Sequence, residues 1–280
     1  MDWYIRNYQR VHFALCGLTV AACAALLFGL YETESVPQGI FALMLLHLLI
    51  GGRLTRRAAN RGITELYRDC DPVPLLENCD RLLAGAEDGD RSSLVLGLRG
   101  NRVAALMALG RLEEAEAELN RVQTLLPAKT DVVKVVACHD RIALNLRKGK
   151  FSGMEQEIEA VRAMLAKARV PSMFFGMSFP VLMELCLEHD ACLLLLNTAG
   201  PIPVLGRRIR NLVEQAPAPM YQAQFIMLLA EYYLARGETG RAEEPLRFVA
   251  EHAPAMEIGA QAARRLERLG VGQPDPNTDR

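Results

Sequence analysis

The sequence lacks the features that mark several common classes of protein. Its formal net charge is −1, whereas nucleic-acid-binding domains are usually clearly basic, so we expect no nucleic-acid partner. None of the seven cysteines forms a C-x-x-C pair, which argues against a zinc ribbon or a thiol redox motif. No run of alternating β-branched residues predicts a strand. Because Leu, Ala, Glu and Arg dominate the long apolar-periodic segments, the chain is predicted to be almost entirely helical.

The motifs of common enzyme classes are also missing. The sequence contains no G-x-G-x-x-G and no G-x-S-x-G. The segment Arg147–Gly153 has some likeness to a phosphate-binding loop, but it lacks the first glycine and follows a predicted helix instead of a strand. We therefore predict no cofactor and no catalytic residue, and we expect that the chain is not an enzyme.

Two uncharged runs lie within the first sixty residues. As a helix, Val11–Leu30 is long enough to cross the hydrocarbon core of a bilayer, and Val36–Gly52 is near the short end of that range. Arginines precede the first run and follow the second, whereas the short connection carries acids and no basic residue. The positive-inside rule then predicts a two-helix transmembrane hairpin over residues 1–61, with both chain ends in the cytoplasm. Residues 11–52 would contact the lipid, and the setting that we expect is a bacterial inner membrane.

Small residues recur every four positions on the first of these runs. Gly17, Ala21 and Ala25 are predicted to face the second helix and to let it pack closely. Three other interpretations remain open for this region. It could be a signal peptide, a lipoprotein signal with Cys23 as the lipidated residue, or a buried hairpin of a soluble core. The signal-peptide interpretation leaves the second apolar run without an explanation.

The rest of the chain uses one spacing of residues twice. In Ala108–Pro127 and in Ala235–Pro254, a glycine is followed by Ala after five residues, Leu after nine, Val after twelve and Pro after seventeen. In the later copy, Ala230 and Tyr233 also stand at matching positions of the preceding helix. The pattern resembles the tetratricopeptide repeat, a helix–turn–helix unit of about 34 residues. The resemblance implies that 94–270 forms an α-solenoid of antiparallel helix pairs.

Other parts of this region carry weaker signals. Gly149 begins a third copy without the closing proline, and length alone places a further pair at Ser172–Glu188 and Val204–Gln215. Residues 62–93 are predicted to connect the hairpin to the repeats, through a helix that begins at Asp71 and Pro72. Two further segments complete the expected organisation: a capping helix, Ala255–Gly270, and a disordered tail, 271–280.

The resemblance implies a membrane-anchored scaffold that binds a protein or a peptide. In such repeats the first helix of each pair lines a concave surface, where side chains serve a partner. The residues expected to contact the partner are Met107, His139, Leu146, Arg147, Gln224, Met227, Glu231 and Leu234.

Two alternative functions remain. His139–Asp140 and His189–Asp190 are His-Asp pairs of the kind that metal phosphohydrolases use, and Cys186, His189 and Cys192 are spaced along one predicted helix. The chain could thus be a membrane-associated enzyme or an enzyme subunit. Because the two pairs fall in separate repeats, we interpret them as ordinary polar residues on solvated helix faces, and we expect no metal. The second alternative is an architectural protein that associates with itself.

Overall fold

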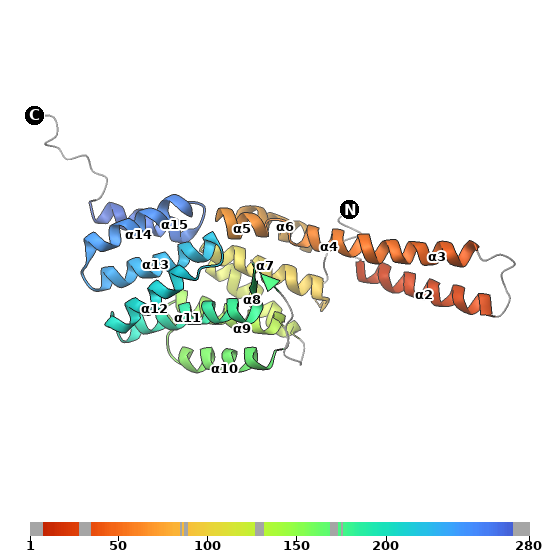
Figure 1. Ribbon diagram of the computed structural model, residues 1–280, viewed down its shortest axis with the longest axis horizontal. Helices are drawn as coiled ribbons and strands as arrows, with labels where there is room; N and C mark the ends of the chain where they lie inside the picture. The colour runs from red at the N-terminus through yellow and green to blue at the C-terminus, as the bar shows by residue number, and fades with distance from the viewer. Residues whose placement is uncertain are drawn as a thin grey trace, which may run out of the picture.

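The chain is mostly helical, as predicted (Figure 1). The computed structural model describes residues 8–27, 35–84, 86, 89–126, 132–168, 173–174 and 176–270, and the predicted tail 271–280 lies outside them. The N-terminal elements are α2 (Tyr8–Leu27), α3 (Ser35–Leu46), the π-helix η1 (His47–Gly51), α4 (Gly52–Ala59), α5 (Ile63–Asp69) and α6 (Val73–Leu83). Then come α7 (Ser93–Ala108), α8 (Leu112–Leu125), α9 (Val132–Arg147), α10 (Met154–Lys167), α11 (Phe179–Thr198), α12 (Pro203–Glu214), α13 (Pro219–Ala235), α14 (Thr239–His252) and α15 (Glu257–Arg268). The strands β1 (Met173–Phe174) and β2 (Met177–Ser178) pair in an antiparallel manner.

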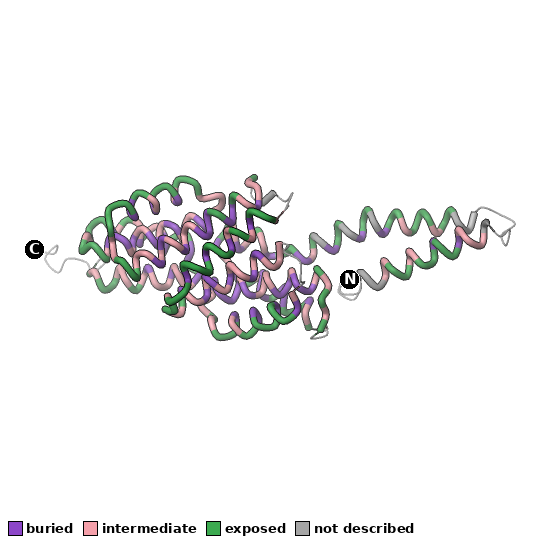
Figure 2. The backbone as a smooth tube through the Cα atoms, turned by 90° about the horizontal axis from the view of Figure 1, so that it is seen from below, coloured by how far each residue is buried: buried purple, intermediate pink, exposed green. Residues whose placement is uncertain are grey.

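Helices α2 and α3 lie side by side and project from the rest of the molecule (Figures 1 and 2). The hydroxyl of Thr19 donates to the carbonyl oxygen of Leu15 at 2.8 Å and lies 3.1 Å from the sulfur of Met44. The rings of His12 and His47 stack with centroids 5.5 Å apart. His12, early in α2, contacts His47, and Thr19, later in α2, contacts the earlier residue Met44. The two segments are therefore antiparallel.

Two of the three small residues predicted to face the second helix are exposed instead, and the third, Ala25, is half-buried. Gly17 and Ala21 are exposed, whereas Thr19 and Ala22 are buried between the helices. The prediction of the contact face was therefore wrong. The hydroxyl of Thr19 explains the difference, because it bonds to its own helix and so can be buried without a free donor.

Large apolar side chains cover the outside of the projecting helices. Phe13, Val20 and Leu45 are 72%, 69% and 57% exposed, and several neighbours are similar. Among the described residues, one helix, Gln38–Ala59, is long and apolar enough to cross a membrane, and Val11–Ala25 is a shorter apolar helix. The second helix is thus longer than the predicted run, because it continues through η1 into α4.

Four consecutive helix pairs follow: α7 with α8, α9 with α10, α11 with α12, and α13 with α14. Each pair turns at a glycine in the left-handed region, where a side chain would strain the backbone. The φ angles are 71° at Gly110, 72° at Gly149, 79° at Gly200 and 73° at Gly237. The repeated glycine of the sequence therefore marks the end of the first helix of each pair.

The second helix of each pair buries the same three positions after its glycine. These positions lie five, nine and twelve residues further on, on one face of the helix. They are Ala115, Leu119 and Val122 in α8; Met154, Ile158 and Val161 in α10; Leu205, Ile209 and Leu212 in α12; and Ala242, Leu246 and Val249 in α14. The pair α11–α12, which was inferred from length, thus follows the spacing, although α11 begins and ends later than predicted.

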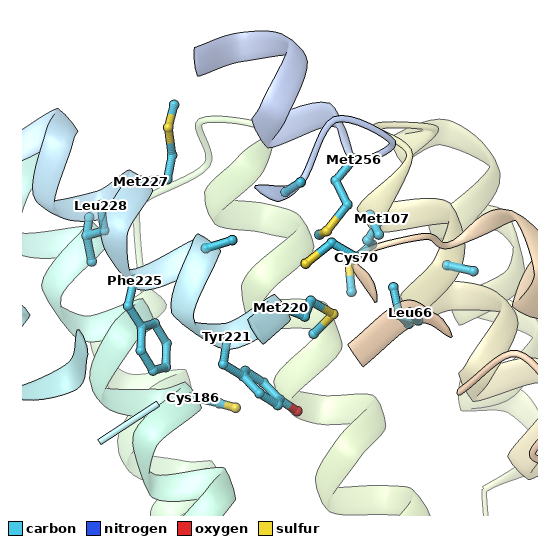
Figure 3. Close-up of a cluster of buried hydrophobic side chains, with 14 of the residues drawn as sticks. Leu66, Cys70, Met107, Cys186, Met220, Tyr221, Phe225, Met227, Leu228 and Met256 are labelled. Carbon is cyan, nitrogen blue, oxygen red and sulfur yellow. The ribbon is translucent and has the colours of Figure 1, made fainter. Parts of the chain in front are cut away.

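The helices before the four pairs pack against the C-terminal end of the array. Helix α5 packs against α13, and the rings of Tyr67 and Tyr221 lie 5.5 Å apart. A Cβ atom at Gly110 would lie 2.8 Å from Cγ of Glu257, at the start of α15. Figure 3 shows Leu66 and other side chains of this junction gathered in one core cluster. Helices α5 and α6, predicted only to connect, therefore belong to the packed domain.

Candidate functional site: a cavity inside the helical domain

In the part of the chain that the structure describes, the helical domain contains a large, partly open cavity of about 1100 Å³. Most of its wall comes from the first helices α7, α9, α11 and α13, together with α5 and the end of α4, and two residues of α8, Leu119 and Val122, also line it. The lining includes Thr55 of α4 and the first residues of three helices: Ser93 of α7, Val132 of α9 and Phe179 of α11. One end of the cavity is therefore next to the helix that leads to the projecting hairpin.

Small residues on α7 create part of this space. Gly97, Gly100 and Ala104 follow one another along the face of α7 that lines the cavity. A Cβ atom at Gly97 or Gly100 would meet no described atom within 4 Å. These glycines cost helix stability, about 1 kcal/mol each relative to alanine. The space that they leave open is the reason the cavity is wide here.

A cluster of ionic side chains from α9 and α11 lines the cavity. Nε2 of His139 lies 3.3 Å from Oδ2 of Asp190, and Nδ1 of His189 lies 3.0 Å from Oδ1 of the same carboxylate. Nδ1 of His139 also lies 3.6 Å from Oδ1 of Asp140. The side chain of Asp190 is only 5% exposed, and that of His139 is 16% exposed. Two helix pairs are thus joined by an ion pair largely removed from water.

The protonation states of this cluster follow from its contacts. Burial acts to lower the pKa of His139, but the carboxylates of Asp140 and Asp190 outweigh it and raise that pKa to about 10. Burial acts to raise the pKa of Asp190, but His139 and His189 hold it well below the usual range. His139 is therefore protonated and Asp190 ionised at neutral pH, and the cluster already satisfies its own charges.

Arg147 of α9 has a different environment. Desolvation by the surrounding protein lowers its pKa, yet the residue is exposed and lines the cavity. In the described part of the chain, Nη1 donates one hydrogen bond, of 2.6 Å, to the carbonyl oxygen of Met107. His139 and Arg147 are two helical turns apart, about 12 Å along α9. A group that enters the cavity can therefore meet a guanidinium that no described carboxylate binds.

Aromatic side chains complete the wall on the side of α5 and α13. Tyr67 lies against Tyr221, and the ring of Phe225 lies 5.4 Å from that of His189. Burial raises the pKa of Tyr67 to about 12 and that of Tyr221 well above its usual value. Burial also raises the pKa of the Cys186 thiol. These groups are neutral at physiological pH and present hydroxyls, a thiol and ring faces, not charge.

The structure separates the eight predicted partner-binding residues into two sets. Met107, His139, Arg147 and Gln224 line the cavity. The other four lie elsewhere: Leu146 and Met227 are buried in the core, Leu234 packs against the core, and Glu231 forms an ion pair with Arg265 of α15.

The structure also brings together residues that the sequence did not connect. Asp140 and Asp190 are 7% and 3% exposed, so the interpretation of the His-Asp pairs as polar residues on solvated faces was wrong for these carboxylates. Asn101 also lines the cavity without having been predicted. One signal was available: each His-Asp pair lies on the first helix of its pair, and first helices share the inner face.

The arrangement offers recognition more clearly than metal chemistry. Among the described residues, no three His, Cys, Asp or Glu side chains are grouped so that they could hold a metal ion. The thiol of Cys192 contacts Glu188 at 3.7 Å, and Cys192 is not among the residues that line the cavity. The cavity has apolar and aromatic walls with a few polar groups, the usual character of a ligand site. Comparisons with protein-family models, with curated proteins and with solved structures find no match to this chain.

Proposed function

We propose that this chain is a membrane-anchored interaction protein that holds a segment of a partner protein in the cavity of its helical domain. The observation that carries this proposal is the cavity itself. It has a volume of about 1100 Å³, at or above the upper end for small-ligand pockets, and first helices of four successive pairs line it. A concave surface formed by the inner helices of a repeat array is a common way to bind an extended chain.

The projecting helices support the anchor. Exposed apolar side chains cover α2 and α3, and burying such a surface in lipid would remove it from water. Arg53 and Arg57 are exposed on α4, just beyond the apolar segment. Under the positive-inside rule, this basic end and the helical domain lie in the cytoplasm, at a bacterial inner membrane in our proposal. An alkaline wash of isolated membranes tests this, because an integral hairpin stays in the pellet and a peripheral protein does not.

The helix pairs support the solenoid of the tetratricopeptide type. The glycine turns and the three buried positions recur in all four described pairs, so each pair buries its apolar face against the next. The anchor would hold this array near the bilayer and raise its effective concentration toward partners in the same membrane.

Photo-crosslinking tests the proposed function in membranes. A photoreactive residue at Ala143, which lines the cavity, should capture a partner protein. The matched control is Ala163 of α10, which is exposed on the outside of the domain and should not. Equal capture at both positions, or capture at Ala163 alone, would contradict the proposal. A crosslink to a second copy of the chain would support the architectural alternative instead.

A membrane-associated enzyme is the second candidate, and one observation favours it. The ion pair of His139 and Asp190 places a protonated imidazolium and a carboxylate at the cavity wall. The raised pKa of His139 suits a proton donor poorly at neutral pH, since an efficient acid has a pKa near the working pH. This candidate predicts that His139→Gln abolishes an activity on a small molecule, while partner capture at Ala143 stays unchanged.

A further inference from the structure

The polar groups of the cavity fall into two sets with different needs. His139, Asp140, His189 and Asp190 form ion pairs with one another, so their charges are compensated without a ligand. Other polar side chains of the wall do not have this internal pairing. Because buried polar groups are normally hydrogen-bonded, the second set indicates what the cavity binds.

Two side-chain amides belong to this second set. Asn101 of α7 and Gln224 of α13 line the cavity and are half-buried. Neither side chain forms a hydrogen bond with another described residue. A side-chain amide has both a donor and an acceptor. Its NH₂ group can donate to a peptide carbonyl oxygen, and its own oxygen can accept from a peptide N–H. Amides on two helices of one cavity therefore match an extended backbone that passes between them.

Arg147 is the third member of this set. Its one described hydrogen bond is to a neutral carbonyl oxygen, so most of its five N–H donors are left for a ligand. The nearby carboxylates of Asp140 and Asp190 are directed to His139. A carboxylate is the natural partner for the planar fork of a guanidinium, and such pairs are stronger than neutral hydrogen bonds.

Much of the remaining wall is apolar, although Thr55, Asn60, Asp90, Ser92 and Ser93 also line it. Val136 of α9, and Leu182 and Met183 of α11, line the cavity and precede the residues of the ionic cluster on their helices. A segment that fills this space must therefore present apolar side chains for most of its length. An aliphatic lipid chain would fit these residues too, but it would leave Asn101 and Gln224 without hydrogen bonds, at a cost of about 1–3 kcal/mol for each buried group.

We propose that the bound partner segment is an extended apolar peptide with one acidic side chain, whose carboxylate pairs with Arg147 while its backbone bonds to Asn101 and Gln224. This inference rests on the proposed function, and it adds the chemistry of the partner. The position of the acid within the segment is set by Arg147, the last residue of α9.

Selection from a random peptide library tests this inference without a known partner. The full chain, held in lipid nanodiscs, is presented to a displayed library of twelve-residue peptides. The wild type should enrich apolar peptides that contain one Asp or Glu. Arg147→Glu should lose that preference and enrich peptides with Lys or Arg. Arg147→Gln should bind the wild-type peptides at least tenfold more weakly.

Arg141→Gln is the matched control on the same helix. Arg141 bonds to Asn120 and Gln123 on the outside of the domain, so its loss should leave the enriched peptides and their affinity unchanged. Thermal unfolding of each variant shows whether it folds. Asn101→Ala and Gln224→Ala should each weaken binding of the same peptides without changing the preference for an acid.

The outcomes separate this inference from the proposed function. If no peptide is enriched above the display background, the proposed function fails. If peptides are enriched but carry no acid, or the same peptides bind Arg147→Glu, only the inference about Arg147 fails. Dodecanoate and dodecyltrimethylammonium are then added as competitors at equal concentrations below their micelle thresholds. If dodecanoate displaces the peptides and dodecyltrimethylammonium does not, the occupant is an anionic amphiphile, and the peptide proposal is overturned.

Discussion

Glycine and arginine occur both in the contacts between neighbouring helices and in the wall of the cavity, with opposite consequences. At the helix contacts, a Cβ atom on Gly259 would lie 2.0 Å from the carbonyl oxygen of Ala253, and Nη1 of Arg99 lies 2.6 Å from Glu118. In the wall, Gly100 faces open space, and Arg147 exposes its guanidinium. The same residue types thus hold the helices together in one region and leave room and charge for a ligand in the other.

The largest expected effect comes from the ion pair at the contact of α7 and α8. The side chains of Arg99 and Glu118 are 5% and 2% exposed. Glu118→Ala therefore removes the carboxylate that pairs with the guanidinium of Arg99, in a place that water hardly reaches. We expect a loss of about 3–5 kcal/mol in the free energy of unfolding, as for other broken buried pairs. Thermal unfolding of the detergent-solubilised chain, followed by circular dichroism, measures it.

Arg147→Gln is the counterpart in the cavity wall. Because Arg147 has no described carboxylate partner and already exposes its side chain, we expect its loss to change stability by less than about 1 kcal/mol. Similar losses for Glu118→Ala and Arg147→Gln would mean that the two arginines have the same structural role, contrary to the comparison.

The pH dependence of stability gives the next effect, on the order of a few kcal/mol. The pKa of His139 is raised to about 10, above the unfolded value of 6.5. Its stabilisation is therefore complete below about pH 6.5 and is lost as the pH rises through about 10. The contacting carboxylate of Asp190, whose pKa is held well below its usual range, stays ionised over this range. The free energy of unfolding should thus decline from pH 6.5 to 10.

His139→Gln is the variant that isolates this decline. It removes the titrating group, so the slope between pH 6.5 and 10 should become clearly smaller, while the variant is less stable at pH 6 than the wild type. Denaturation measured at four or five pH values checks this. An unchanged slope would show that His139 does not carry a raised pKa.

Gly259→Ala should have a moderate effect. The added methyl group would overlap the backbone between α14 and α15, and overpacking of this kind costs about 1–3 kcal/mol. The melting temperature measures the loss. An increase in stability would show that α15 does not pack as closely as the structure indicates.

Gly100→Ala should have the smallest effect and the opposite sign. The new methyl group meets no described atom within 4 Å, and alanine favours a helix over glycine by about 0.5–1 kcal/mol. The melting temperature should therefore rise slightly. A loss comparable to that of Gly259→Ala would mean that the space beside Gly100 is filled by other groups.

Much of the helical domain could be predicted, because turns and close contacts leave local signals. Gly110 and Gly237 marked two turns, and the buried residues after them followed the expected spacing. The pair at Gly200 was harder to find. Its first buried position is Leu205 where two other copies have alanine, so only the offsets remained as a signal.

The site was less predictable, because local spacing does not show which helix faces meet. His139 and Asp190 lie in different pairs, and only the arrangement of the inner helices brings them to 3.3 Å. Leu146 is next to Arg147 in sequence, but one residue turns the side chain by about 100°, from the cavity into the core. A rotation of this size decides whether a residue lines the site, and the sequence alone does not define which face of the helix is turned toward the cavity.

Blocking the cavity tests the central claim most directly. Gly100→Phe places a ring in the open space beside α7, and Gly240→Phe places the same ring on the exposed surface of α14. The measurement is the yield of the partner crosslink from Ala143 in native membranes, with folding checked by thermal unfolding. We expect the yield to fall at least tenfold for Gly100→Phe and to stay unchanged for Gly240→Phe. An undiminished yield from a folded Gly100→Phe chain would contradict the claim that the partner occupies the cavity.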